Sequence, residues 1–112
     1  MRSQKLSEIR REVINTLRKL AQELNATIYL FGSYARGDHM LDSDVDIVIV
    51  SKTFEGMNYV SRVELVRTKL PPHISFDIIP LTPQEFKERR EKPFFKEISR
   101  YWIEIKPQHP QA

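Results

Sequence analysis

The residues best suited to chemistry lie in one stretch, Phe31–Val50, which reads FGSYARGDHMLDSDVDIVIV. Gly32 and Ser33 come first, and after ten further residues Asp44 and Asp46 open an apolar run. A glycine lets bare backbone approach an anion, and a serine adds a hydroxyl donor. Two aspartates two apart on a strand share a face, and a carboxylate pair suits a hard cation such as Mg²⁺. The stretch therefore predicts a site for a nucleoside triphosphate and its metal.

Two other phosphate or metal loops do not fit these residues. Aspartates at every second position from Asp42 resemble a calcium loop, but Ile47 and Thr53 stand where that loop needs glycine and glutamate. Gly32 and Gly37 have the spacing of a P-loop, but the next two residues are Asp-His instead of Lys-Ser/Thr. The aspartate pair therefore needs another explanation.

The surrounding sequence predicts the elements that position these side chains. Apolar residues at steps of three and four indicate a helix over Leu6–Leu24, and β-branched and aromatic residues indicate a strand over Thr27–Phe31. Val45–Val50 is almost continuously apolar, which predicts a central strand covered on both faces. The glycine and serine thus follow the first strand, and the carboxylate pair begins the second.

The second half of the chain predicts further strands and helices. Asn58–Leu70 is expected to be a helix with Val60, Val63 and Val66 on its apolar side. Thr82-Pro83-Gln84-Glu85 has the signature of a capped helix start. The other expected elements are a strand over Ile74–Pro80, a break in the last helix at Pro93, and an edge strand over Tyr101–Lys106. Four strands and several helices indicate an α/β (α+β) fold.

Length and composition indicate one small domain. The chain has 112 residues, of which 40% are hydrophobic and 29% charged, enough for a single core. We expect residues 1–106 to form this domain and residues 107–112 to be a disordered tail. The chain has no cysteine, which excludes disulfides and thiolate zinc sites.

Charge and hydropathy limit the partners. The net charge of +3 and the pI of about 9.3 are too modest to indicate direct nucleic-acid binding. No apolar run approaches the roughly 20 residues that span a bilayer, so no membrane association is expected. The charged N-terminal segment lacks the apolar stretch of a secretory signal, and we expect a cytoplasmic protein.

With these motifs the chain resembles the nucleotidyltransferase superfamily of the DNA polymerase beta type, and within it the minimal nucleotidyltransferases. Their hallmark is Gly-Ser, ten residues, then Asp-x-Asp, which matches Gly32-Ser33 and Asp44-Val45-Asp46. The family's third carboxylate lies on a neighbouring strand after a helix, where this chain has Asp77. The resemblance implies a polymerase beta-like fold, with helices packed on a small mixed sheet of about four strands.

The resemblance also implies the chemistry of the site. Asp44, Asp46 and Asp77 would be the catalytic and metal-binding residues, serving two Mg²⁺ ions in transfer from a nucleoside triphosphate. Asp77 would also be placed to accept a proton from the acceptor hydroxyl. Gly32 and Ser33 would bind the β- and γ-phosphates, and Arg36 is a further nucleotide-binding candidate, although an ordinary surface role is equally open for it.

Each of these residues also has a plainer interpretation. Asp42, Asp44 and Asp46 could be solvated turn residues, and Asp77 a strand residue that faces solvent. Tyr34 and His39 are expected to be structural or solvent-facing. The charged run over residues 87–92 is expected to be a solvated helix face.

The resemblance implies a partner as well. Minimal nucleotidyltransferases look like the antitoxin half of HEPN/MNT toxin-antitoxin modules, which implies transfer of AMP from ATP to a hydroxyl, with tyrosine as the favoured acceptor, of a HEPN ribonuclease toxin. Two alternatives stay open: a non-catalytic subunit that masks its partner, and a stand-alone nucleotidyltransferase acting on a small molecule across a homo-oligomer interface. Phe94, Phe95 and Trp102 fit an interface as well as a core.

Overall fold

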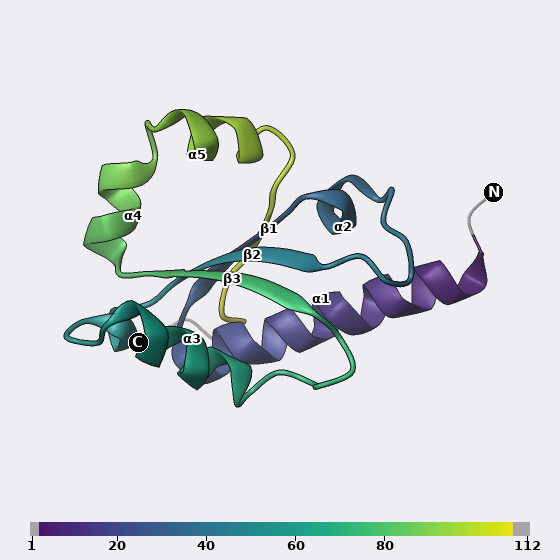
Figure 1. Ribbon diagram of the computed structural model, residues 1–112, viewed down its shortest axis with the longest axis horizontal. Coiled ribbons are helices and arrows are strands. Elements are labelled where there is room, and N and C mark those ends of the chain that lie inside the picture. Colours follow the sequence, from purple (N-terminus) through teal and green to yellow (C-terminus); the bar gives the residue numbers. More distant parts are fainter. Residues whose placement is uncertain (1–2, 109–112) are drawn as a thin grey trace.

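The computed structural model describes residues 3–108, which form a four-stranded sheet with helices on both faces (Figure 1). The elements in chain order are α1 (Gln4–Leu24), β1 (Thr27–Phe31), α2 (Ser33–Arg36), β2 (Val45–Val50), a 3-10 turn (Lys52–Phe54), α3 (Tyr59–Arg67), β3 (Phe76–Leu81), α4 (Pro83–Arg89), α5 (Pro93–Ile98) and β4 (Ile103–Ile105). The first two strands have the predicted bounds, and Pro93 does divide the last helical segment in two.

The strand order in the sheet is β3-β2-β1-β4. β1 runs antiparallel to β2 and to β4, whereas β2 and β3 are parallel. The sheet is therefore mixed, as the resemblance implied, and β2 has neighbours on both sides, as its continuous apolar run predicted. β4 lies at one edge, also as expected.

The two faces of the sheet are covered by different helices. α1 and α3 pack on one face and bury alternate residues of the strands, including Ile28, Leu30, Val45, Ile47, Ile49 and Ile78. α4 and α5 lie over the opposite face (Figure 1), where a smaller cluster joins Val48 and Leu81 to Phe86 and Phe95. Phe95 is therefore core, and Trp102, which packs partly buried against this cluster, belongs with it.

α1 is stabilised by burial of its apolar face against the sheet. Val13, Leu17, Leu20 and Ala21 are all buried against the sheet. The helix begins at the Ser3 cap, whose hydroxyl accepts the backbone N–H of residue 6 at 3.2 Å. No helix among residues 3–108, α1 included, has both the length and the apolar character needed to cross a bilayer.

α3 differs from its predicted orientation. Val60, expected on the apolar side, is 63% exposed, whereas Arg62 is buried. The guanidinium can be buried because it donates to Glu85 at 2.6 and 3.2 Å, and to the carbonyl oxygens of Met57 at 2.9 Å and Pro80 at 3.3 Å. The helix therefore turns this arginine inward, which an apolar pattern does not reveal.

The Arg62–Glu85 pair also fixes the start of α4. Thr82 caps this helix, and its side chain and that of Glu85 form the predicted capping box. Glu85 thus holds the cap and Arg62 together. These contacts tie α4 to α3 around the edge of the sheet at β3.

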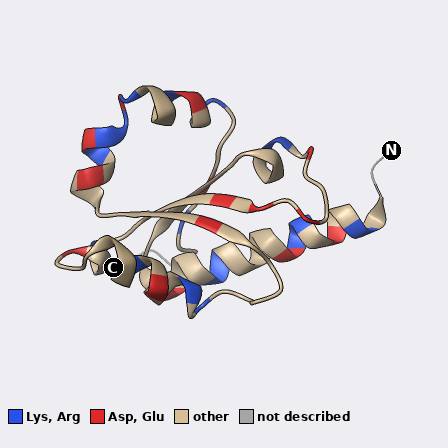
Figure 2. Cartoon of the chain, viewed as in Figure 1, with Lys and Arg blue, Asp and Glu red and all other residues tan. Residues whose placement is uncertain are grey.

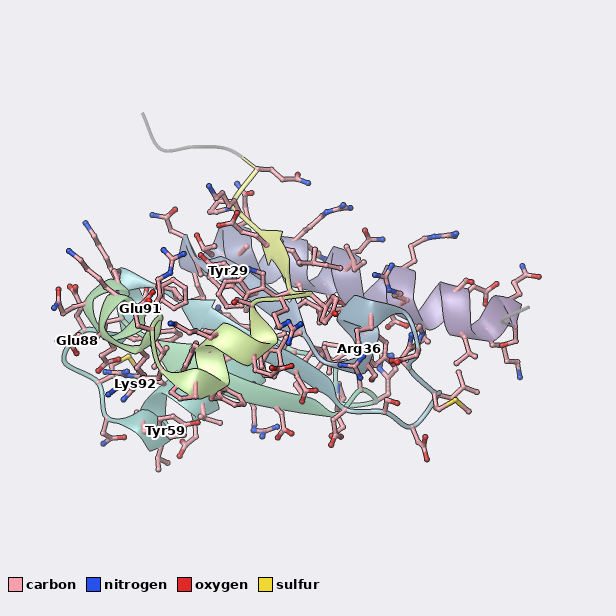
Figure 3. All side chains as sticks on the ribbon, turned by 90° about the horizontal axis from the view of Figure 1, so that it is seen from above. Tyr29, Arg36, Tyr59, Glu88, Glu91 and Lys92 are labelled. Atoms are coloured by element: carbon pink, nitrogen blue, oxygen red, sulfur yellow. The ribbon has the colours of Figure 1, made fainter. Side chains whose placement is uncertain are left out.

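The other elements of the C-terminal half differ from prediction at their ends. β3 begins two residues later than expected, since Ile74 is buried without belonging to the strand. The helix predicted up to Leu70 ends at Arg67, and β4 is shorter than expected. Residues 87–92 are exposed as predicted, and Figure 3 shows Glu88, Glu91 and Lys92 around the turn between α4 and α5.

Only part of the predicted tail can be compared with the structure. Residues 109–112 lie outside the described residues. The backbone N–H of Gln108 donates to the side chain of Gln22 on α1 at 3.0 Å, so the described part of this segment contacts the domain.

Candidate functional site

Two of the predicted carboxylates lie side by side on the sheet. Asp46 of β2 and Asp77 of β3 are partners in the parallel register, so their side chains leave the same face. Their chain neighbours, such as Val45, Ile47 and Ile78, point into the core under α1 and α3. The aspartates therefore point to the opposite face, the one that carries α4 and α5. Figure 2 shows the acidic segments of β2 and β3 next to each other.

Asp44 adds a third carboxylate, one residue before β2 begins. Asp44 and Asp77 are exposed, and Asp46 is half-buried. Burial raises the pKa of Asp46 above its usual value, the charges of Asp77 and Asp44 raise it further, and the Arg36 guanidinium acts in the opposite direction. The ionised form of Asp46 is thus disfavoured by its burial and by the two neighbouring carboxylates.

Gly32 lies directly against Asp46. Its φ of 74° and ψ of −155° fall in a region that is essentially limited to glycine. A Cβ built on Gly32 would collide with the Asp46 carboxylate oxygen Oδ2. The glycine is therefore required both by its backbone angles and by the space that Asp46 fills.

Ser33 begins the short helix α2, for which Gly32 is the N-cap residue. The carbonyl of Gly32 accepts the N–H groups of residues 35 and 36 at 3.1 Å each. Because the first N–H groups of a helix have no partner within it, the Gly32–Ser33 turn presents backbone donors next to Asp46. Arg36 ends α2 and donates to Asp38 at 3.3 Å, and Figure 3 shows its exposed side chain.

Comparison with known proteins identifies the arrangement. Residues 10–105 match the family model described as "Nucleotidyltransferase domain". The chain belongs to this nucleotidyltransferase family. A Methanocaldococcus jannaschii protein named "Putative protein adenylyltransferase MJ0141" is 26% identical over 101 residues, covering 84% of this chain and 99% of that protein.

Solved structures share the fold of this nucleotidyltransferase. A crystal structure of a putative nucleotidyltransferase from Sulfolobus solfataricus aligns with a TM-score of 0.61 and 21% identity, over 92% of this chain and 87% of the other. A chain of a toxin-antitoxin structure with AMP-PNP aligns with a TM-score of 0.59 and 20% identity, over 86% and 74%. At this level of identity the likeness establishes the fold.

The donor set of the nucleotidyltransferase suits a hard divalent cation. Carboxylate oxygens are the ligands that Mg²⁺ prefers, and a cation between Asp44, Asp46 and Asp77 would relieve the repulsion that raises the pKa of Asp46. As they stand, no three Asp, Glu, His or Cys side chains within residues 3–108 are gathered into a ready ion-binding cluster. Residue type and placement fit the metal, and the side chains would have to close around it.

Sequence reasoning missed the residue that fastens α2. Arg10 of α1 donates through Nε to the carbonyl of Tyr34 at 2.8 Å and through Nη2 to that of Ala35 at 3.5 Å. These are carbonyls of α2, so Arg10 fixes the short helix that carries Ser33. One arginine among the several basic residues of α1 gives no signal of this role, because the contact joins residues 24 and 25 positions apart.

Tyr34 and His39 are structural, one of the two roles expected for them. Both are buried, and their rings stack with centroids 4.3 Å apart. His39 Nε2 lies 2.8 Å from the carbonyl oxygen of Leu6, to which it donates because a carbonyl can only accept. The two rings hold the loop between α2 and β2 against the start of α1.

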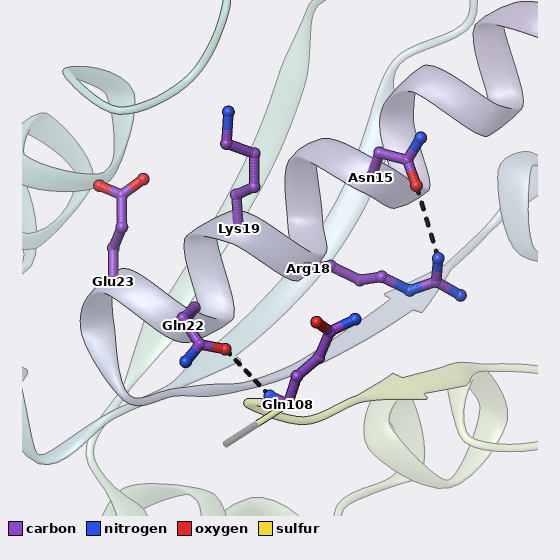
Figure 4. A pocket seen from close by; sticks show the side chains of 6 residues that line it. All are labelled: Asn15, Arg18, Lys19, Gln22, Glu23 and Gln108. Carbon is purple, nitrogen blue, oxygen red and sulfur yellow. Dashed lines mark hydrogen bonds between the residues drawn. The ribbon is translucent and has the colours of Figure 1, made fainter. Parts of the chain in front are cut away.

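A shallow hollow on α1 is not the candidate site. It has a volume of about 540 Å³ and lies over the half of α1 that leads to β1 (Figure 4). Its lining consists of long polar side chains of α1 and of Gln108, joined in places by hydrogen bonds: Asn15, Arg18, Lys19, Gln22, Glu23 and Gln108. α1 covers the face opposite the aspartates, so this hollow has no contact with the carboxylates.

Proposed function

We propose that this protein is an Mg²⁺-dependent nucleotidyltransferase that transfers AMP from ATP to a hydroxyl group of a partner protein. The observation that carries the proposal is the placement of Asp46 and Asp77 as register partners on one face of the sheet, with Asp44 one residue before β2 and Gly32 against Asp46. Three acidic side chains beside backbone donors suit a reaction at a polyphosphate.

We assign the residues the roles that the resemblance to the family implies. Gly32 and Ser33 would bind the β- and γ-phosphates through backbone N–H groups and the serine hydroxyl. Asp44, Asp46 and Asp77 would hold the divalent cations, whose charge neutralises the attacking and leaving oxygens. Arg36 lies close enough to act on the charge of Asp46 and would approach the triphosphate if it left Asp38.

The reaction balances without a further reactant. The acceptor oxygen forms a bond to the α-phosphorus, and the bond from that phosphorus to the oxygen bridging the β-phosphate breaks. The electron pair of that bond leaves with pyrophosphate. The acceptor proton would pass to Asp77, whose exposed carboxylate lies at the open side of the site.

The acceptor that we favour is a tyrosine of a HEPN ribonuclease toxin, with this chain as the antitoxin. A protein acceptor agrees with the relative named as a putative protein adenylyltransferase, which aligns along 99% of its length, and a toxin-antitoxin setting agrees with one structural neighbour. The HEPN identity of the partner and the tyrosine come from the family resemblance alone. A protein acceptor also agrees with the open, exposed surroundings of Asp44 and Asp77.

The test is label transfer from ATP radiolabelled at the α-phosphate, with Mg²⁺, to a purified HEPN toxin or to proteins of a host lysate. We expect a labelled protein with the wild type and none with the Asp44→Asn, Asp46→Asn double variant. Asp42→Asn is the matched control, since Asp42 is an exposed turn residue outside the strand, and it should label like the wild type.

Other outcomes would indicate another function. A toxin that is inhibited and bound without gaining mass would make this chain a masking subunit. Label that appears only in a small molecule would indicate a stand-alone transferase. Labelling of the acceptor by ATP radiolabelled at the γ-phosphate, but not by ATP radiolabelled at the α-phosphate, would contradict nucleotidyl transfer.

A further inference from the structure

The face of the sheet that carries the aspartates also carries a continuous cluster of aromatic rings. Successive ring centroids lie 4.2 to 6.4 Å apart along this cluster. In order of contact its members are Trp102, Tyr29, Phe86, Phe95, Phe94 and Phe31. Two of these rings belong to β1, and Trp102 comes one residue before β4. α4 and α5 supply the other three.

Phe94 is the member of this cluster that opens to solvent. It is 51% exposed, whereas Phe95 beside it is 6% exposed, and the remaining rings are buried or half-buried. Phe94 is held on both sides: its centroid lies 6.0 Å from that of Phe31 and 5.4 Å from that of Phe95, each at 87°. An aromatic ring held by its neighbours and exposed to water is a surface for another planar group.

This opening lies at the aspartate end of the cluster. Phe31 is the register partner of Asp46, and Cα atoms of such a pair are about 5 Å apart. Phe31 is also the residue immediately before Gly32. Phe94 therefore lies one ring beyond the residue that adjoins both the carboxylates and the Gly32–Ser33 turn.

We propose that Phe94 is the stacking surface for the nucleobase of the triphosphate, with Phe31 supporting it from the sheet. This inference rests on the proposed function and adds the part of the site that binds the nucleoside. Triphosphate and base would then bind to different elements, α2 and β2 for the phosphates and α5 for the base. Since every base has a flat π face, stacking on Phe94 gives affinity without discriminating between purines.

The experiment separates the base from the phosphates. Binding of ATP and of inorganic tripolyphosphate, each with Mg²⁺, is measured by titration calorimetry for the wild type, Phe94→Leu and Phe94→Trp. Leucine keeps apolar contact with Phe95 but removes the π face, and tryptophan keeps it. Tyr101→Leu is the control, because Tyr101 is 61% exposed and lies outside the cluster.

We expect Phe94→Leu to weaken ATP binding roughly 5- to 100-fold and to leave tripolyphosphate binding unchanged. Phe94→Trp should bind ATP at least as well as the wild type, and Tyr101→Leu should bind both ligands normally. Thermal melts of each variant verify that the domain is folded.

Three results would overturn the proposal. One is equal ATP affinity in Phe94→Leu and the wild type. If transfer to the acceptor then falls while ATP affinity is unchanged, Phe94 contacts the acceptor and not the base. Another is an equal loss of ATP and tripolyphosphate affinity in Phe94→Leu, which would indicate distortion of the phosphate site. The third is a wild type that binds neither ligand, which would remove the proposed function as well.

Discussion

Replacement of Gly32 by alanine tests how the turn and the carboxylates are built together. Alanine in the backbone region that Gly32 occupies costs of order 1–3 kcal/mol. In addition, its Cβ would collide with Asp46 Oδ2, so the Asp46 carboxylate must rotate away or the turn must move. We expect a total loss of about 2–4 kcal/mol in the free energy of unfolding, with loss of AMP transfer.

The two contributions can be separated by urea unfolding of matched variants. Gly56→Ala should lose stability only through its positive φ, since Gly56 has a φ of 82° and a Cβ there would meet nothing within 4 Å. In an Asp46→Ala background the collision is absent, so Gly32→Ala should cost less there, by about 0.5–3 kcal/mol. At this chain length each kcal/mol corresponds to about 4 °C in Tm.

Additive effects of Gly32→Ala and Asp46→Ala on the free energy of unfolding would contradict this interpretation. If Gly32→Ala cost the same with and without the Asp46 side chain, and no more than Gly56→Ala, the contact between Gly32 and Asp46 would have no energetic meaning. Retention of full transfer activity in Gly32→Ala would likewise show that the Asp46 position does not depend on this glycine.

Three further predictions concern charged residues of the site and of the elements that surround it. Asp46→Asn should raise Tm at pH 7, because burial and neighbouring carboxylates raise the pKa of Asp46, yet should abolish transfer in the labelling assay. Glu85→Gln should destabilise the domain by about 1–2 kcal/mol at pH 7, a value discounted for partial solvent exposure. Arg62 and the capping box lower the pKa of Glu85 to about 2 from 4.5, so its contribution is complete above pH 4.5 and is lost as pH falls through about 2; urea unfolding at pH 7 and pH 2.5 should show the difference between the two proteins shrinking. Arg10→Met should cost about 1–2 kcal/mol by thermal unfolding and raise KM for ATP, because α2 loses its fastening.

The sequence predicted those elements that local pattern determines. Thr27–Phe31 and Val45–Val50 are β-branched or apolar runs with clear limits, and the structure has the same bounds. The capping box at Thr82 was equally clear, because the residues that form it are three apart. Local pattern failed at two apolar residues. Ile74 was expected to begin a strand but is buried outside it, and Val60 was expected on the apolar side of α3 but is exposed.

Long-range contacts were the part that sequence did not provide. The aspartates could be assigned to one face by their spacing, but their proximity to Gly32 depends on the register of β1 with β2. The burial of Arg62 depends on Glu85, which lies 23 residues away in the chain. Fold and family are confirmed, whereas the roles of Asp44, Asp46 and Asp77 stay predictions until the variants are measured.

The face of the sheet that carries Asp46 and Asp77 is covered by apolar side chains of α4 and α5 over only part of its area, and the carboxylates explain this limit. Carboxylates cannot be buried in a dry environment without partners, so α4 and α5 can seal this face only away from Asp46 and Asp77. The seal consists of Phe86 and Phe95, and at its limit the chain exposes the Phe94 ring instead of a polar side chain. In the proposed complex, divalent cations would offset the repulsion between these carboxylates and a triphosphate, and a base stacked on Phe94 would cover its exposed ring. The proposed nucleotide would therefore lie across the boundary between the two halves of this face, with its phosphates near the carboxylates and its base on Phe94.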